Sequence, residues 1–271
     1  MTGIFSPVND DHAIERVVFG ISFDRAFEAE EIAAIRQQHH LWLEDLPAVR
    51  EPPSFVILAD AEQKLQAIPA PTIEFAFVRP DGSAVWSLRF IGPEAMVECT
   101  RYTRWDKIWS AAFKHLERVL ALTEVAGGAR VVRKATLVVQ DAFVTDEGVG
   151  DVSEVVSPTP MLPSQIFNVG PEWHVHTGHF EPCNDGSRVL SNLNVDAVLQ
   201  RFEKEDGPER HRISMLHVLI ADRSESEPDE QDAIIHWLKQ KMDEFHASNK
   251  KMLGHILSDK IIARIGLQSG V

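Results

Sequence analysis

The chain has 271 residues, of which 44% are hydrophobic and 25% are charged, and this composition is typical of a folded globular protein rather than of a disordered one. Its 41 acidic and 27 basic residues give a formal net charge of -14, which disfavours nucleic acid as a ligand and is compatible with a basic protein partner. The sequence contains no apolar run of transmembrane length, no secretion signal at its start and no paired cysteine motif, so we expect a cytoplasmic protein without a membrane span or a disulfide framework.

The first predicted elements are a strand and a helix. Hydrophobic side chains alternate over residues 14–23, which predicts a strand with one apolar face. Acidic residues from Glu28 onward are typical of the first turn of a helix, and Pro47 predicts its end. Short apolar runs separated by turn residues between 54 and 101 then predict an antiparallel meander with a tight turn at Pro80-Asp81-Gly82.

A second helix follows the meander. Apolar residues at helical spacing from Trp105 to Leu120 predict a helix whose aromatic side chains belong to the core. The residues from Val131 to Val144 predict another strand, and the acidic, proline-rich residues 146–165 predict a linker. Residues 1–145 therefore form a predicted N-terminal half.

The predicted C-terminal half, residues 166–271, contains a meander and a long helix. Its three strands are expected at Trp173–Glu181, Arg188–Leu199 and Ile213–Asp222. A long helix is expected to begin near Pro228, and a last short helix follows Ser258. The fold class is therefore α+β, with mostly antiparallel sheet, packed helices and two αβ halves, and one continuous domain remains an alternative to two.

A histidine-rich hairpin is the main candidate site. If the turn between its strands is centred on residues 184–186, His174 falls opposite Asp196 and His176 falls opposite Asn194. These four side chains would then share one polar face of the hairpin, while Trp173 and its apolar neighbours take the other face. The simplest interpretation is a solvated sheet face, and the alternatives are a binding surface or a metal site.

The metal alternative rests on the spacing of the histidines. His174 and His176 lie two residues apart on one strand, so with Glu181 or Asp196 they could hold one ion. The same residues resemble the first metal-binding motif of the cupin barrels. However, the flanking glycines Gly170 and Gly186 stand at shorter offsets than in cupins and no second motif follows, so the likeness is interpreted as coincidental.

Other catalytic signals are absent from the sequence. It contains no phosphate-binding glycine loop, no nucleophile elbow and no zinc-protease motif, so we assign no catalytic residue and expect no cofactor. One group of basic residues could form a patch on the acidic body, although scattered solvated charges are the commoner explanation. These residues are Arg101, Arg104, Lys107, Arg118, Arg130, Arg133 and Lys134.

Four segments resemble a sporadically distributed bacterial family of uncharacterised proteins. They are residues 15–23, Tyr102 with Trp105, residues 133–141, and His246-Ala-Ser-Asn249 through Leu257-Ser-Asp259. A departure occurs at Lys134-Ala-Thr-Leu-Val, where the family tends to have an Arg-Tyr-Ile-Asn-like strand. The resemblance implies a bacterial α+β protein, and suggests an accessory or neutralising role near defence or toxin genes, without an active site to carry over.

Together these features favour a non-enzymatic binding or accessory protein that acts through a protein partner. His174, His176, Asn194 and Asp196 are the predicted binding residues, and a homo-oligomer is left open. The alternative is a metal-dependent enzyme that uses His174 and His176 with Glu181 or Asp196. A nucleic-acid binder using the basic group ranks last because of the net charge.

Overall fold

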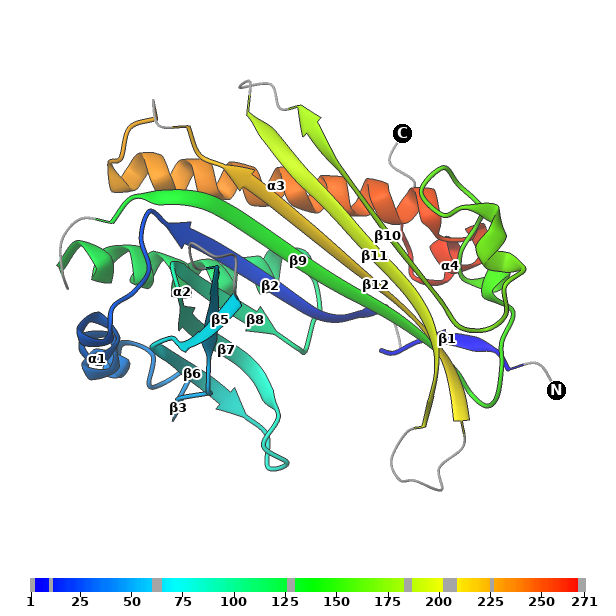
Figure 1. Ribbon diagram of the computed structural model, residues 1–271, viewed down its shortest axis with the longest axis horizontal. Coiled ribbons are helices and arrows are strands. Elements are labelled where there is room, and N and C mark those ends of the chain that lie inside the picture. Colours follow the sequence, from blue (N-terminus) through cyan, green and yellow to red (C-terminus); the bar gives the residue numbers. More distant parts are fainter. Residues whose placement is uncertain are drawn as a thin grey trace. The chain divides into compact units, whose positions relative to one another are not determined.

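A computed structural model describes residues 3–9, 12–59, 65–125, 130–182, 187–201, 209–224 and 227–267. Within these residues the protein is an α+β structure with four α-helices and a large antiparallel sheet (Figure 1). The α-helices are α1 (Ala29–Gln37), α2 (Trp105–Val125), α3 (Gln231–Ile256) and α4 (Asp259–Arg264), and the short 3-10 helices are η1 (His39–Leu41), η2 (Val152–Glu154) and η3 (Ser164–Phe167).

The sheet contains ten of the described strands. Along its path the strand order is β10-β11-β12-β9-β2-β8-β7-β6-β3, and β1 pairs with β9. These strands are β1 (Phe5–Pro7), β2 (Ile14–Phe23), β3 (Ala48–Arg50), β6 (Thr72–Val78), β7 (Ala84–Ile91), β8 (Glu94–Cys99), β9 (Val132–Thr145), β10 (Trp173–Pro182), β11 (Arg188–Arg201) and β12 (Glu209–Asp222). The expected strand at residues 14–23, the expected strand after α2 and the expected hairpin strands are therefore present.

The predicted meander between residues 54 and 101 is partly wrong. β4 (Phe55–Ala59) pairs with β5 (Leu65–Pro69) in a separate two-stranded sheet, and the meander itself consists of β6, β7 and β8. Short apolar runs identify strands but not their partners, because pairing depends on contacts outside the run.

The turn between β6 and β7 has the predicted geometry. Gly82 has a φ of 85°, a left-handed conformation that glycine adopts without steric cost. Its amide donates to the carbonyl of Arg79 at 2.9 Å, and the Asp81 carboxylate accepts from the amide of Ser83 at 2.8 Å. Hydrogen bonds from Ser83 lower the pKa of Asp81.

The same order of elements occurs twice along the chain. Each set contains a strand, a short helical segment, a three-stranded meander and a long helix in this order, and the first set has β3, β4 and β5 in addition before its meander. The first set runs from β2 through β6, β7 and β8 to α2, and the second runs from β9 through β10, β11 and β12 to α3. In each set the first strand lies next to the last strand of its meander in the sheet order.

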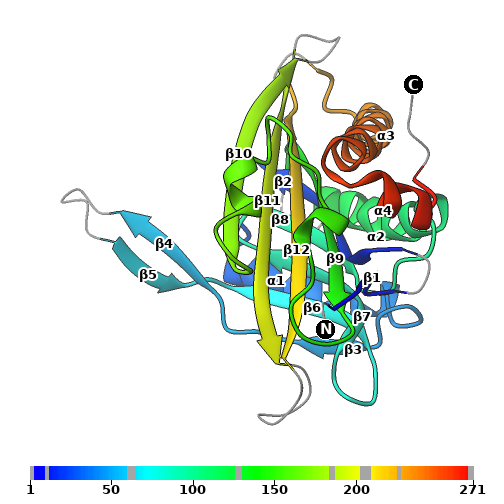
Figure 2. The same cartoon turned by 90° about the vertical axis from the view of Figure 1, so that its right-hand side faces the viewer.

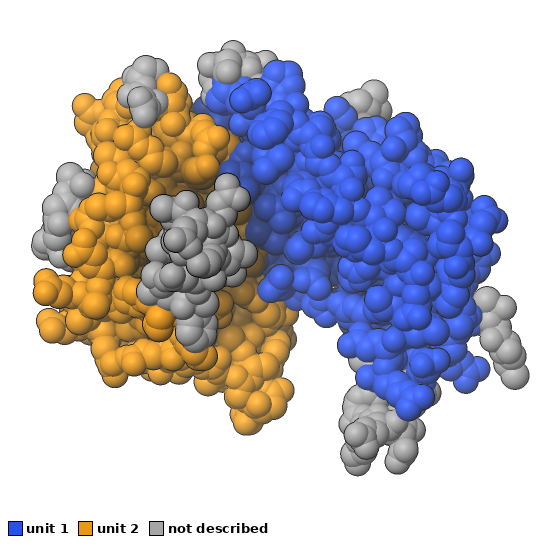
Figure 3. All heavy atoms as spheres, in the orientation of Figure 1, with its two compact units in different colours: residues 1–17, 137–220, 240–271 blue, residues 18–136, 221–239 orange. Residues whose placement is uncertain are grey.

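The chain divides into two compact units (Figure 3). Unit 1 comprises residues 1–17, 137–220 and 240–271, and unit 2 comprises residues 18–136 and 221–239. Four elements, β2, β9, β12 and α3, contribute residues to both units. The division into halves at residues 146–165 stays a prediction.

Unit 1 buries its core between the sheet and the helices α3 and α4, which lie on one side of β10, β11 and β12 in Figure 2. Alternate residues of β11 and β12 supply the sheet side of this core, and Met252, Leu253 and Ile256 supply the helix side. Residues from the expected linker also belong to it: Val152, Val155, Val156 and Leu162 are buried there. Ser258 caps α4, as expected, by accepting from the amide of Ile261 at 3.3 Å.

Unit 2 has an aromatic core. Phe19 lies 5.2 Å from Trp109 between ring centroids, and Trp42 lies 5.4 Å from Phe75. Trp109 and Phe113 of α2 are buried, which confirms that these aromatic side chains belong to the core. Cys99 is a buried free thiol, as expected, whereas Cys183 lies outside the described residues. In the part of the chain that is described, no helix is long and apolar enough to cross a membrane.

Candidate functional site

The histidine hairpin has the register that the sequence predicts. β10 pairs antiparallel with β11, and His174 lies opposite Asp196 while His176 lies opposite Asn194. Directly opposite residues of an antiparallel pair project to the same side, so the four side chains share one face. We call these four residues the histidine face.

The histidine face is the solvent side of the hairpin. His174 and His176 are exposed, and Asn194 and Asp196 are half-buried. The intervening residues of β11 point to the other side, where Leu193 and Val195 belong to the core of unit 1. The predicted division into a polar and an apolar face is therefore confirmed, and α3 packs on the apolar face.

Two neighbours that sequence reasoning missed hold residues of the histidine face in place. Nε2 of His176 lies 2.5 Å from Oδ1 of Asn192, which is two residues before Asn194 and therefore on the same face. The hydroxyl of Ser214 on β12 donates to Oδ2 of Asp196 at 2.7 Å. The alternation of β12 indicated that Ser214 is on the less buried side, but only the pairing of β11 with β12 brings it to Asp196.

The polar surface continues across the sheet of unit 1. Arg212 of β12 donates to the carboxylate of Glu15 at 2.6 Å, and the side chain of Gln140 donates to the same oxygen at 2.8 Å. Arg212 has the same orientation as Ser214, because the two are separated by one residue on the strand. A row of hydrogen-bonded polar groups therefore extends from the hairpin through β12 and β9 to β2.

The structure does not bring Glu181 to the histidine face. Glu181 has the opposite strand parity to His174 and His176, and its carboxylate accepts from the hydroxyl of Ser248 on α3 at 3.4 Å. Its other oxygen lies 3.2 Å from Nε2 of His179. Of the two expected carboxylate ligands, only Asp196 lies on the same face as the two histidines.

A buried polar chain lies on the helix side of the same strands. Nδ1 of His217 lies 2.9 Å from Oδ1 of Asn249, and Nε2 of His217 lies 3.0 Å from Oγ of Ser191. With the proton on Nδ1, His217 donates a hydrogen bond to Asn249 and accepts one from Ser191. Ser191, His217 and Asn249 are then arranged like a nucleophile, its base and the group that orients the base. Burial lowers the pKa of His217, although the hydrogen bond with Asn249 opposes this effect.

The buried hydrogen bonds of Ser191, His217 and Asn249 are closed to solvent. Ser191 has 1% of its surface exposed and His217 has 2%, so a substrate does not reach the hydroxyl in this structure. Ser191 also lies within β11, paired with His179 of β10. The chain of hydrogen bonds satisfies the polar groups of a histidine enclosed between α3 and the sheet. His217 alternates with apolar residues in the predicted strand 213–222, and that pattern was the available signal for its burial.

Three of the seven basic residues of the predicted patch, Arg118, Arg130 and Lys134, pair with carboxylates in unit 2. Arg118 pairs with Asp45 at 3.1 Å and Lys134 pairs with Asp222 at 3.0 Å. Arg130 is nearly enclosed, pairs with Glu31 and lies over the ring of Phe27. Burial raises the pKa of Glu31, but hydrogen bonds from Arg25, the amide of Glu28 and Arg130 lower it to about 2 overall.

Among residues whose placement is described, no group of three or more histidine, cysteine, aspartate or glutamate side chains is arranged to hold a metal ion.

In the comparisons with known proteins, no family model matches the chain and no curated protein has significant sequence similarity to it. The resemblance to the sporadically distributed bacterial family stays a prediction.

Proposed function

We propose that this chain is a non-enzymatic binding or accessory protein that acts through a protein partner, with the histidine face as its contact surface. The observation that supports the proposal is the row of hydrogen-bonded polar side chains on the solvent side of the sheet, opposite α3. Hydrogen bonds to Asn192 and Ser214 hold His176 and Asp196 in defined orientations. Side chains that are already ordered lose less conformational entropy on binding.

Charge favours a partner with a basic contact surface. The chain carries a formal net charge of -14, and long-range attraction of this kind accelerates association with a basic protein. The two histidines add hydrogen-bonding groups beside the carboxylate of Asp196. A basic side chain of the partner that reaches Asp196 would therefore meet an acceptor flanked by imidazole rings.

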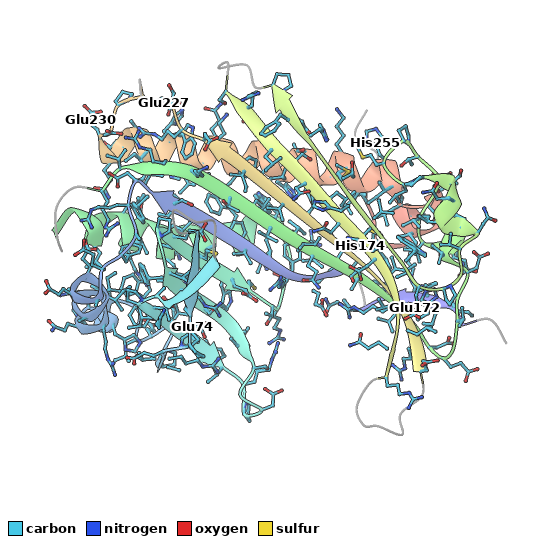
Figure 4. All side chains as sticks on the ribbon, in the orientation of Figure 1. Glu74, Glu172, His174, Glu227, Glu230 and His255 are labelled. Carbon is cyan, nitrogen blue, oxygen red and sulfur yellow. The ribbon has the colours of Figure 1, made fainter. Side chains whose placement is uncertain are left out.

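The test compares two pairs of exposed histidines. The double variant His174→Ala/His176→Ala removes imidazoles of the histidine face, and His40→Ala/His255→Ala removes two exposed imidazoles elsewhere (Figure 4 labels His174 on the hairpin and His255 on α3). Untagged full-length proteins are immobilised and exposed to a bacterial lysate, and captured proteins are quantified by mass spectrometry. We expect a protein retained by the wild type and the control but retained about tenfold less by the histidine-face variant.

Two further readouts of the same proteins distinguish the candidate functions. Capture that falls steeply between ~0.05 and ~0.5 M NaCl supports a basic partner, because salt screens exposed charges. A captured set that is unchanged by His174→Ala/His176→Ala contradicts the proposal. Stoichiometric metal in the untagged wild type that disappears in this variant contradicts it as well, and favours the metal-dependent enzyme with Asp196 as the third ligand.

A further inference from the structure

The strand β10 lies at one end of the sheet order and is ten residues long. Its residues pair with β11 on one side without a shift in register from Trp173 to Pro182. In the described part of the chain, no strand pairs with its outer side. The other end of the sheet differs, because β3 has only three residues.

The sequence of β10 lacks the features that usually protect an edge strand. Soluble proteins discourage edge pairing with lysines, internal prolines, bulges or very short strands. β10 contains no lysine, and its only proline, Pro182, is the last residue of the strand. Its side chain Phe180 is 58% exposed, with the guanidinium of Arg188 5.0 Å from the ring centroid.

The strand is also complementary to a second copy of itself. In a twofold dimer of antiparallel edge strands, the number of each residue and the number of its partner in the second copy add up to the same value for every pair. This value is even, because the twofold axis keeps the same face of both strands on the same side of the joined sheet. Centring the pair on Thr177 uses residues 173–181, all of the strand except Pro182. His174 then lies opposite Phe180 of the second copy, Trp173 opposite Glu181, and His176 opposite Gly178.

This register brings complementary groups together. It places no two carboxylates opposite each other and it pairs an exposed phenyl ring with an imidazole on each side of the axis. The other pair of ends brings Trp173 opposite Glu181 of the second copy, so no charge faces a like charge there either.

We infer that the protein forms a twofold homodimer in which β10 pairs antiparallel with β10 of a second copy about Thr177. The two sheets become continuous, and the histidine faces of both copies lie on the same side of the joined sheet. The inference stands on the edge strand and does not depend on the proposed function. Failure of dimer formation leaves the partner-capture test unaffected, and failure of capture leaves the dimer unaffected.

The test uses charges at two positions that the register places opposite each other. In the full-length double variant His174→Lys/Phe180→Lys, each new lysine faces a lysine of the second copy, twice per dimer. Both native side chains are exposed, so the fold tolerates the change. The control is His40→Lys/Phe77→Lys, which alters an exposed histidine and a 47% exposed phenylalanine that are not part of β10.

Light scattering coupled to size-exclusion chromatography gives the mass of each species up to ~100 µM, and far-UV circular dichroism verifies folding. The wild type and the control are expected at twice the chain mass of 30.4 kDa, and the lysine variant at the chain mass. A second variant, His174→Glu/Phe180→Glu, is expected to be monomeric alone and to form a mixed dimer with the lysine variant.

Three outcomes overturn the inference. The first is a wild type that stays monomeric over the whole concentration range. The second is a dimer that persists in the folded lysine variant, because it then uses another surface. The third is a lysine variant and a glutamate variant that are both monomeric and remain so when mixed, since opposite charges facing each other should restore the pairing.

Discussion

At the scale of single residues, Asp141 on β9 is the ionisable group most affected by burial among those with a resolved shift. It is 3% exposed, and burial raises its pKa from 3.8 to about 7. Because the folded-state pKa lies above the unfolded-state value, the folded chain retains a proton that the unfolded chain releases between these pH values. Asp141 therefore makes the folded state less stable as the pH rises from about 4 to about 7.

The substitution Asp141→Asn removes this pH dependence. Relative to the wild type, we expect the free energy of unfolding of the variant to increase between pH 4 and pH 8 by a few kcal/mol, with roughly 4 kcal/mol as the limit set by the shift. Urea denaturation at several pH values measures the difference. The exposed Asp243→Asn provides the control, and a difference for Asp141→Asn that is constant with pH would contradict the expectation.

His115 on α2 acts with the opposite sign in the same pH range. Burial lowers its pKa from 6.5 to about 4, and the histidine is 5% exposed. Here the folded-state pKa lies below the unfolded-state value, so the contribution to stability is present above pH 6.5 and is lost as the pH falls toward 4. The two groups offset each other in the wild type, which is why the Asp141 effect is measured as a difference between variant and wild type.

At the scale of elements, a carboxylate joins the three strands β3, β6 and β7. Glu74 lies directly opposite Arg50 on one neighbouring strand and Arg89 on the other. Nε of Arg89 donates to its carboxylate at 2.9 Å, and Nη1 of Arg50 lies 3.4 Å away. The carboxylate is 4% exposed, while both guanidinium groups reach solvent.

Replacing this carboxylate by an amide tests how much the cross-strand ladder stabilises the edge. We expect Glu74→Gln to lower the free energy of unfolding by about 2 kcal/mol, because two charged donors lose their anionic acceptor at a buried position. Chemical denaturation at pH 7 gives the value. The control is Glu51→Gln, which removes the exposed carboxylate that pairs with Arg36. It should change the free energy of unfolding by less than about 0.5 kcal/mol. Equal effects of the two substitutions would show that burial of Glu74 does not matter.

At the scale of the whole molecule, both units depend on segments that are far apart in the chain. Unit 1 takes residues from three separate stretches, and its core includes Val152, Val155 and Val156 as well as β11, β12 and α3. The predicted C-terminal half, residues 166–271, lacks these valines and all of β9. The strand next to β12 is thus missing from that fragment.

A fragment of residues 166–271 is therefore expected not to fold alone. Its circular dichroism should show no cooperative thermal transition, and its amide resonances should be poorly dispersed. In this fragment β12 lacks its neighbour β9 and α3 lacks the valines that pack with it, so apolar surface is left in water. The full chain measured in parallel serves as the reference. A well-dispersed spectrum of the fragment would instead support the division into halves at residues 146–165.

Part of the candidate site follows from sequence because a hairpin is local. The alternation in residues 173–181 and 188–199 and the turn residues between them were sufficient to place His174 opposite Asp196. The same alternation placed Glu181 on the opposite face from His174, although it was kept as a possible ligand. Asn192 was not predicted, although its strand parity, which is the same as that of Asn194, was a signal available in the sequence.

The sequence by itself determined the fold class, most of the strands and the pairing of β10 with β11, since these depend on side-chain periodicity and on turns between neighbouring residues. Only the tertiary structure decided the order of the strands and the contacts that cross between them. Ser214 and Asp196 are 18 residues apart, His217 and Asn249 are 32 apart, and Arg212 and Glu15 are 197 apart. Such pairs depend on which strands and helices pack together, and local periodicity contains no information about that choice.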